Sequence, residues 1–138
     1  MKYLGLDLGE KTLGIALSES GIIASNLTTI RFKSEEYEDA VNQLIPLIQK
    51  YKIDCIVLGL PKHMNNDLGI KGQSSIDFKA LIESKIDIKV VLWDERLSTK
   101  SALKILSLSN KKYDKQRQLK DEVAAQVILQ NYLDSRGN

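Results

Sequence analysis

The sequence predicts an α/β domain built on a five-stranded mixed sheet with helices on both faces. Three observations lead to this prediction. Residues 2–31 have the pattern of three short strands joined by tight turns, two later apolar runs end at polar loops, and segments of helical periodicity separate and follow those runs. Hairpin strands followed by alternating helices and strands make a mixed sheet that is covered on both sides.

The first strand is expected over residues 2–8, where leucines alternate with Tyr3, Gly5 and Asp7. This period of two places Asp7 on the same face as Gly5. Turns rich in Gly, Glu and Ser then lead into TLGIALS and into IIASNLTTI. Because tight turns join antiparallel neighbours, the chain is expected to open with three antiparallel strands.

Helical spacing of apolar residues predicts a helix over 35–51, with Ser34 as its cap and a kink at Pro46. The continuously apolar segments IDCIVLGLP and IKVVLW are typical of strands buried on both faces. The other expected helices are 74–85, a helix capped by Ser98 or Thr99 that runs to Leu108, and 119–133.

Composition indicates one globular domain over residues 1–138, because 138 residues with 43% hydrophobic and 28% charged content suit a single core. The net charge of +2 permits nucleic-acid binding without demonstrating it. Positive charge is densest in KKYDKQRQLK, which contains Lys111, Lys112, Lys115, Arg117 and Lys120.

Several classes of protein are excluded by composition. The only cysteine, Cys55, can form no internal disulfide, and one histidine with one cysteine cannot build a conventional zinc site. The amino terminus is unlike a signal peptide, and no apolar run approaches the length of a membrane span. A cytoplasmic protein without a membrane partner is therefore expected.

Three acidic sites lie where apolar segments start or stop: Asp7, the pair Asp94 and Glu95, and Asp121. Taken singly, they suit a strand end, a turn and the first turn of a helix. If the later strands run parallel to the first, their carboxyl ends meet at one edge of the sheet. Carboxylates gathered there would repel one another unless Mg²⁺ or Mn²⁺ neutralised them.

Oxygen ligands without His or Cys suit hard cations, of which Mg²⁺ is the natural choice. Two such ions about 4 Å apart can activate water and stabilise the leaving oxygen of a phosphodiester. Lysines and arginines nearby would hold the phosphate backbone. Hydrolysis of nucleic-acid phosphodiesters is the reaction that this arrangement favours.

Four motifs in order, DLGEKTLGIALS, VLGLPKHMN, WDERLST and KDEVAAQVILQNYLD, resemble the YqgF (RuvX) family, which is similar to the RuvC Holliday-junction resolvases. The resemblance covers essentially the whole chain. It implies an RNase H-like fold, for which the sheet order is 3-2-1-4-5 with strand 2 antiparallel. It also implies a Mg²⁺-dependent nuclease site and a role in maturing the 5′ end of pre-16S rRNA, with Holliday-junction resolution as the second assignment.

By this resemblance, Asp7, Glu95 and Asp121 match the catalytic and metal-binding carboxylates. Asp94 is the alternative middle ligand, because adjacent strand residues point to opposite faces, and the longer reach of Glu95 favours Glu95. The resolvases carry an acidic residue on the strand that corresponds to IVLGLP, whereas this chain has Gly59 there. The second carboxylate must then come from the next strand.

The expected partners are structured RNA, in particular pre-16S rRNA, or DNA junctions, contacted by a monomer or a homodimer. Phosphate contacts are expected from Lys11, Arg96 and the basic stretch between Lys111 and Lys120. The other interpretations are a hairpin turn for Lys11, a brace for Asp94 in the case of Arg96, and a solvated loop for the basic stretch. A non-catalytic nucleic-acid-binding module is the alternative of a different class.

Overall fold

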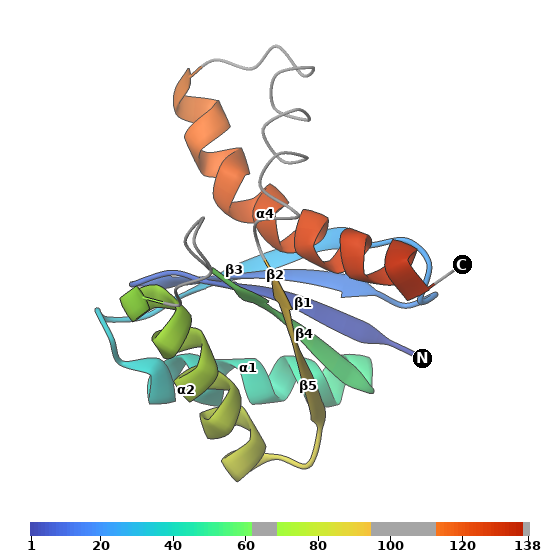
Figure 1. Cartoon of the computed structure of the whole chain (residues 1–138), viewed down its shortest axis with the longest axis horizontal. Coiled ribbons are helices and arrows are strands. Elements are labelled where there is room, and N and C mark those ends of the chain that lie inside the picture. The colour runs from blue at the N-terminus through green and yellow to red at the C-terminus, as the bar shows by residue number, and fades with distance from the viewer. Residues whose placement is uncertain (62–68, 95–112, 137–138) are drawn as a thin grey trace.

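The computed structural model describes residues 1–61, 69–94 and 113–136, with the side chains of 69–71 and 113–122 left out (Figure 1). The strands are β1 (Tyr3–Leu8), β2 (Thr12–Ser18), β3 (Ser25–Arg31), β4 (Cys55–Leu60) and β5 (Lys89–Asp94). The helices are α1 (Tyr37–Tyr51), α2 (Gly69–Lys85) and α4 (Tyr113–Arg136). None of these helices is both long and apolar enough to cross a membrane.

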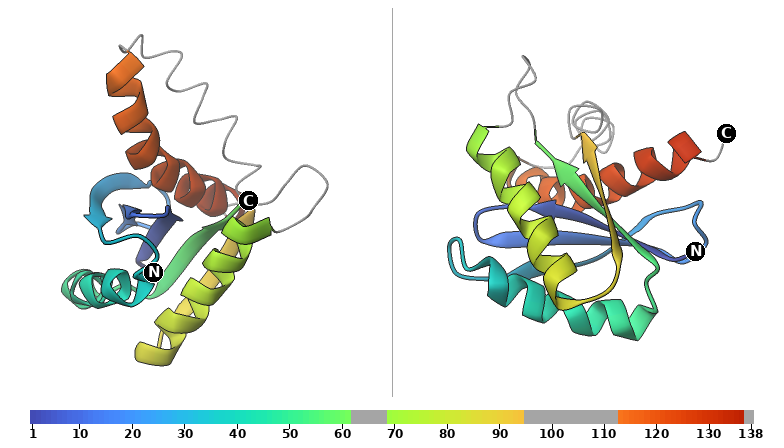
Figure 2. Two further views of the ribbon diagram at one scale, coloured as in Figure 1. Left: turned by 90° about the vertical axis from the view of Figure 1, so that its left-hand side faces the viewer. Right: turned by 60° about the horizontal axis from the view of Figure 1, so that its bottom comes forward.

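The sheet confirms the predicted order and directions. Its strands lie in the order β3-β2-β1-β4-β5. Strand β2 is antiparallel to β1 and to β3, whereas β1, β4 and β5 are parallel. The arrows of β4 and β5 end at the same edge of the sheet in the right-hand view of Figure 2.

Helices cover both faces of the sheet, with α1 and α2 on one face and α4 on the other (Figures 1 and 2). The period-2 pattern of β1 explains the two layers. Leu4 and Leu6 are buried against residues of α1 and α2, whereas Tyr3 is buried with residues of α4. Each strand face thus supplies one of two apolar cores, as expected for a sheet between helical layers.

The start of α1 differs from the prediction, in which Ser34 was its cap. The helix begins at Tyr37, and Glu36 at the cap position makes no side-chain capping hydrogen bond. The Ser34 hydroxyl instead donates to Glu10 Oε1 at 2.8 Å, which ties the β3–α1 connection to the β1–β2 turn. The helix runs through Pro46, which removes one N–H donor.

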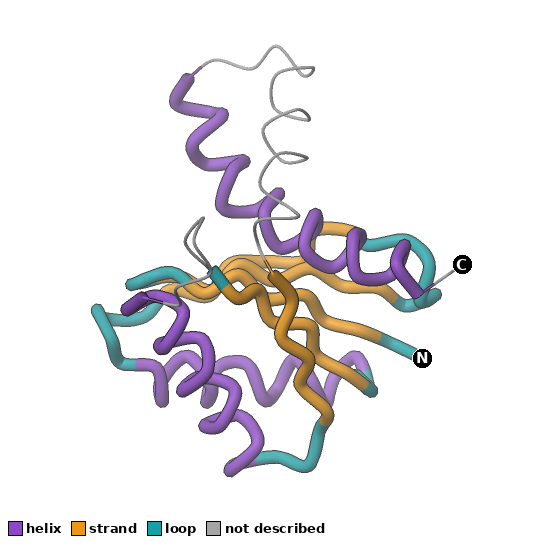
Figure 3. The backbone as a smooth tube through the Cα atoms, in the orientation of Figure 1, coloured by secondary structure: helices purple, strands orange, loops and turns teal. Residues whose placement is uncertain are grey.

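Other boundaries were also predicted imperfectly. The third strand begins at Ser25, because Gly21 to Ala24 form a connection whose main chain bonds to side chains. Helix α2 begins five residues before the predicted 74, and α4 begins six residues before the predicted 119. The helix expected between Ser98 and Leu108 lies outside the described residues. Figure 3 shows how short the described connections are compared with the strands and helices.

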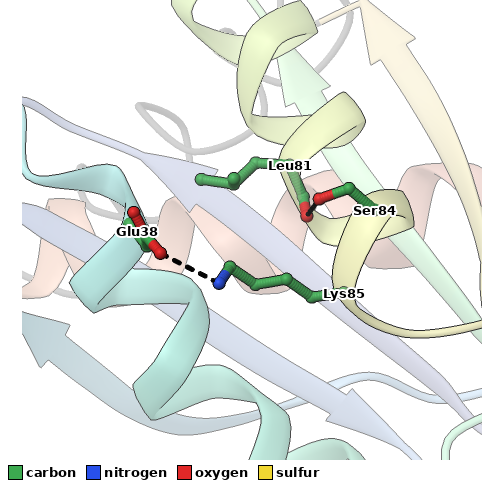
Figure 4. A network of polar contacts seen from close by, with 4 residues as sticks. All are labelled: Glu38, Leu81, Ser84 and Lys85. Carbon is green, nitrogen blue, oxygen red and sulfur yellow. Dashed lines mark hydrogen bonds and ion pairs between the residues drawn. The ribbon is translucent and has the colours of Figure 1, made fainter.

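One ion pair joins α1 and α2 on the surface (Figure 4). Lys85 Nζ lies 3.1 Å from Glu38 Oε1, and the two side chains are 26% and 71% exposed. Solvent screening at this exposure leaves little net stabilisation.

We expect Lys85→Met to lower the free energy of unfolding by less than about 0.5 kcal/mol. Urea denaturation can check this against Leu44→Ala, which empties a fully buried position and should cost about 3 kcal/mol.

Candidate metal and nucleic-acid site

The parallel strands bring two of the predicted acidic sites to one edge of the sheet. Asp7 is the fifth residue of the six-residue β1, and Asp94 is the last residue of β5. Between them lies the carboxyl end of β4, whose Leu60 pairs with Asp94. The expectation that Asp7, the β4 end and Asp94 share an edge is therefore confirmed.

Asp7 and Asp94 do not share a face of the sheet. Asp7 alternates in register with Gly5, which lies against α4. Asp94 alternates with Leu92, which packs against the core under α1 and α2. The residue between them in β5, Trp93, packs with the α4 core. Asp7 therefore lies on the α4 face of the edge, and Asp94 lies on the opposite face.

The strand positions beside Asp7 carry no side chains. On β2 its register partner is Gly14. On β4 the register pairs Leu6 with Leu58, so that Gly59 continues the row beside Asp7. The two neighbouring positions in this row are thus glycines, and both are buried. Strand β4 itself has no carboxylate on this face, because its sequence is CIVLGL.

Trp93 of β5 pairs with Gly59 of β4 and is therefore the next residue in this row across the sheet. Its ring packs against Tyr132 of α4 in a T-shaped contact, with centroids 5.6 Å apart. Its indole Nε1 is buried and has no hydrogen-bond partner within the described part of the chain. The Trp93 side chain is partly buried and packs against the core between the sheet and α4.

The β1–β2 turn places Lys11 at the same edge as Asp7. The turn is closed by a 2.7 Å hydrogen bond from Gly9 N–H to Thr12 C=O. Lys11 C=O accepts a 2.9 Å bond from Phe32 N–H, which anchors the main chain while the Lys11 side chain stays exposed. The Lys11 side chain is therefore exposed at the edge that carries Asp7.

Helix α4 packs on β1 at very close range. A Cβ atom built on Gly5 would lie 2.6 Å from Leu129 Cβ and 2.9 Å from Ala125 O. Toward the start of β1, Tyr3 contacts Tyr132, with ring centroids 6.1 Å apart. Tyr3, at the start of β1, therefore meets a later residue of α4 than Gly5 does. Where α4 packs on β1 it runs antiparallel to that strand, and its amino-terminal part rises away from the sheet (Figure 1).

The predicted set of functional residues is only partly described. Asp121 belongs to α4, one turn before Ala125, but its side chain is not described. The same holds for the basic side chains of the predicted nucleic-acid surface on α4, namely Lys115, Arg117 and Lys120. Four further predictions, Glu95, Arg96, Lys111 and Lys112, lie outside the described residues. No group of three His, Cys, Asp or Glu residues that could hold a metal occurs among the described residues.

Cys55 offers no reactive thiol. The side chain is 1% exposed and belongs to the core between the sheet and α4. Burial raises the pKa of the Cys55 thiol, and Lys89 and Arg136 oppose that rise only partly. A thiol with a raised pKa is a poor nucleophile at neutral pH. Cys55 is therefore a core residue, as the sequence predicted.

Two residues of α4 with a structural role were not predicted from the sequence. Gln126 and Gln130 of α4 hydrogen bond to the main chain of the β2–β3 connection. Their spacing of four residues, on the side of α4 next to its apolar stripe, was the available signal. It was missed because a glutamine at the border of a helix face is usually solvated.

A family model described as "RuvX: Holliday junction resolvase" matches residues 1–135 of the chain. The solved structures that resemble it include Thermus thermophilus RuvC, both alone and in complex with a Holliday junction substrate. The complex has a TM-score of 0.63 and 12% identity, and the match covers 99% of this chain and 95% of that chain. At this identity the likeness shows the fold alone.

Curated relatives are much closer in sequence. A protein of Onion yellows phytoplasma (strain OY-M) is 59% identical over 132 residues, which cover 95% of this chain and 87% of that protein. A protein of Staphylococcus aureus (strain bovine RF122 / ET3-1) is 44% identical, with 97% and 96% covered. Both carry the name "Putative pre-16S rRNA nuclease". With a family match over nearly its whole length and relatives at this identity, the chain belongs to the RuvX family.

Proposed function

We propose that this protein is a cytoplasmic, divalent-metal-dependent nuclease that hydrolyses nucleic-acid phosphodiesters, with pre-16S rRNA at its 5′ end as substrate. The observation that carries the proposal is the position of Asp7. It lies at the carboxyl edge of three parallel strands, between glycine positions, on the face of the sheet against which α4 packs. The names of the relatives from phytoplasma and Staphylococcus supply the substrate.

Glu95 is proposed as the middle carboxylate. Asp94 shares a face with Leu92, away from α4, and is therefore badly placed to meet Asp7. Successive residues of a strand point to opposite faces, so a carboxylate directly after Asp94 suits the Asp7 face. This argument from register supports the choice that the reach of Glu95 suggested.

Asp121 is proposed as the third carboxylate. Ala125 lies over Gly5, and Asp121 lies one helical turn before Ala125 in α4. Asp7 follows Gly5 by two residues in β1 and lies on the same face of the strand. The steps are about 6 Å along the helix and about 7 Å along the strand. Both steps start from the contact of α4 with β1, where the helix and the strand run antiparallel.

The donor set of these three residues fits a hard cation, because it consists of carboxylate oxygens without sulfur or imidazole. We propose Mg²⁺, with Mn²⁺ as a substitute. The metal would supply the positive charge that lowers the pKa of an attacking water and stabilises the leaving oxygen. The chain itself provides the carboxylates, and the phosphodiester would approach them at the carboxyl edge of the parallel strands.

Phosphate contacts are proposed for Lys11, for Arg96 and for the basic residues that lead to Asp121. Lys11 is exposed at the Asp7 edge. Lys115, Arg117 and Lys120 share α4 with Asp121, so that positive charge precedes the proposed ligand along the same helix. Such contacts position the nucleic acid without reading its sequence.

Resolution of Holliday junctions is the second candidate. The family description and the likeness to RuvC bound to a junction favour it. The same carboxylates would serve both reactions. A resolvase also needs two active sites that face the two strands to be cut, so it would act as a symmetric dimer.

Cleavage assays test the proposal directly. The full chain is incubated with an end-labelled pre-16S rRNA fragment or a four-way DNA junction, in Mg²⁺, in Mn²⁺ and with a chelator. We expect metal-dependent cleavage of the rRNA fragment, with Asp7→Asn at least a hundredfold slower, since it removes a metal ligand. Preferred cleavage of the junction would assign the resolvase function instead. No cleavage of either substrate, or equal cleavage by Asp7→Asn, would reject the catalytic function and leave a binding module.

A further inference from the structure

The carboxyl-terminal half of α4 is attached to the β2–β3 connection by its two glutamines. Ala24 N–H donates to Gln130 Oε1 at 2.9 Å, and Ala24 C=O accepts from Gln126 Nε2 at 3.1 Å. Gln130 Nε2 also donates to Ile22 C=O at 2.9 Å. The two side chains therefore bond both main-chain groups of Ala24, as a neighbouring strand would.

The amide group of Gln130 uses both of its N–H donors and also accepts one hydrogen bond. Its second N–H donates to Asp134 Oδ1, one turn later in α4, at 2.9 Å. One acceptor bond and two donor bonds fix the orientation of the amide. Ala24 is 3% exposed, so its main-chain groups would be left without partners if the glutamines moved away.

The β2–β3 connection, to which the glutamines bond, is held in place by hydrogen bonds of its own. Ser18 Oγ accepts a 3.0 Å bond from Gly21 N–H. Ser20 Oγ accepts from Ile22 N–H and Ile23 N–H, at 3.0 and 3.1 Å. Four consecutive main-chain N–H groups, from Gly21 to Ala24, thus donate to side chains. The connection is a fixed anchor for α4.

Apolar packing alone would not set the position of α4 so closely. Contacts of the α4 core with the sheet are non-directional, and the contact at Gly5 fixes how near the helix approaches. Hydrogen bonds are directional and fail beyond a few tenths of an ångström. A helix that slid or rotated by one residue would turn Gln126 and Gln130 by about 100° away from Ala24.

We propose that Gln126 and Gln130 are positioning residues that hold α4 in the register at which Asp121 completes the metal site beside Asp7. The inference rests on the proposed function, because it assigns the glutamines a role through Asp121. From Gln130 to Asp121 is nine residues, or about 13 Å of helix. We call the hydrogen bonds of Gln126 and Gln130 to the β2–β3 connection the clamp. The clamp lies at the far end of the sheet from the Asp7 edge and contacts neither metal nor substrate.

Binding of Mn²⁺ by the full chain, measured by calorimetry without substrate, tests this role. Groups that orient metal ligands typically contribute about tenfold or more to metal affinity. We expect Gln130→Met to weaken Mn²⁺ binding about tenfold, and Gln126→Met, which removes one bond, to weaken it less. All variants are compared at a temperature where circular dichroism shows them folded.

Gln43 provides a matched control on the other face of the sheet. Its Nε2 donates to Arg31 C=O at 3.1 Å and to Asp39 Oδ2, one turn earlier in α1, at 3.0 Å. Gln43→Met therefore removes the same two kinds of donor bond from a helix without a proposed ligand. We expect it to change Mn²⁺ affinity less than about twofold, the spread expected for a distant site.

A double-mutant cycle separates the clamp from the metal site. If Gln130 acts through Asp121, Gln130→Met should weaken Mn²⁺ binding no further in an Asp121→Asn background. Equal affinities of Gln130→Met and Gln43→Met, with Asp121→Asn weakened, would overturn the clamp and leave the site intact. Additive losses would also overturn it. Wild-type affinity in Asp121→Asn would instead remove the proposed ligand, and the inference with it.

Discussion

Glu95→Gln is expected to lower metal-dependent cleavage about a thousandfold, while Asp94→Asn lowers it less than about tenfold. Loss of a charged metal ligand removes several kcal/mol of transition-state stabilisation, and about 4 kcal/mol corresponds to a thousandfold. Asp94 lies on the face of β5 that packs toward α1 and α2. Initial rates on the same labelled substrate, at saturating Mn²⁺, measure both effects.

The two variants control for each other, because each replaces a carboxylate with an amide of nearly the same size at adjacent positions. Melting temperatures show whether either change unfolds the chain, and the rates are compared only between folded variants. A thousandfold loss in Asp94→Asn with near-normal activity in Glu95→Gln would make Asp94 the ligand. It would also mean that the side chains of β5 no longer alternate between the two faces of the sheet at its carboxyl end.

The fold was largely predictable because its signals are local and repeat along the chain. Alternation in β1 placed Asp7 and Gly5 on one face, and the apolar runs at β4 and β5 marked strands buried on both sides. Those patterns follow from the geometry of a strand. Directions followed too, because right-handed crossovers bring parallel strands to one edge.

Details that depend on partners distant in sequence were not predictable. Ser34 suited a helix cap by its neighbours in sequence, but it bonds to Glu10, which is 24 residues away. Ala125 is the residue of α4 that meets Gly5, and the rotation of the helix that brings it there depends on the sheet beneath it. The clamp on Ala24 joins residues more than 100 positions apart. For the same reason, the convergence of Asp7, Glu95 and Asp121 stays a prediction.

Gly5→Val is expected to destabilise the protein by about 3 kcal/mol, as overpacking of a well-packed core does. Strand propensity alone predicts the opposite sign, since valine is favoured over glycine in strands by up to about 1 kcal/mol. The packing argument prevails because the new Cβ would lie 2.6 Å from Leu129 Cβ and 2.9 Å from the main-chain oxygen of Ala125. Neither atom can move unless α4 moves away from β1.

Urea denaturation of Gly5→Val, with Ala80→Met as an exposed small-to-large control, measures this effect. The control should stay within about 0.5 kcal/mol of the wild type. Because α4 also carries Asp121, the displaced helix should weaken Mn²⁺ binding in the fraction that remains folded. A Gly5→Val protein as stable as the wild type would show that α4 can pack further from β1 at no cost. The close approach at Gly5 would then not be what sets the distance between α4 and β1.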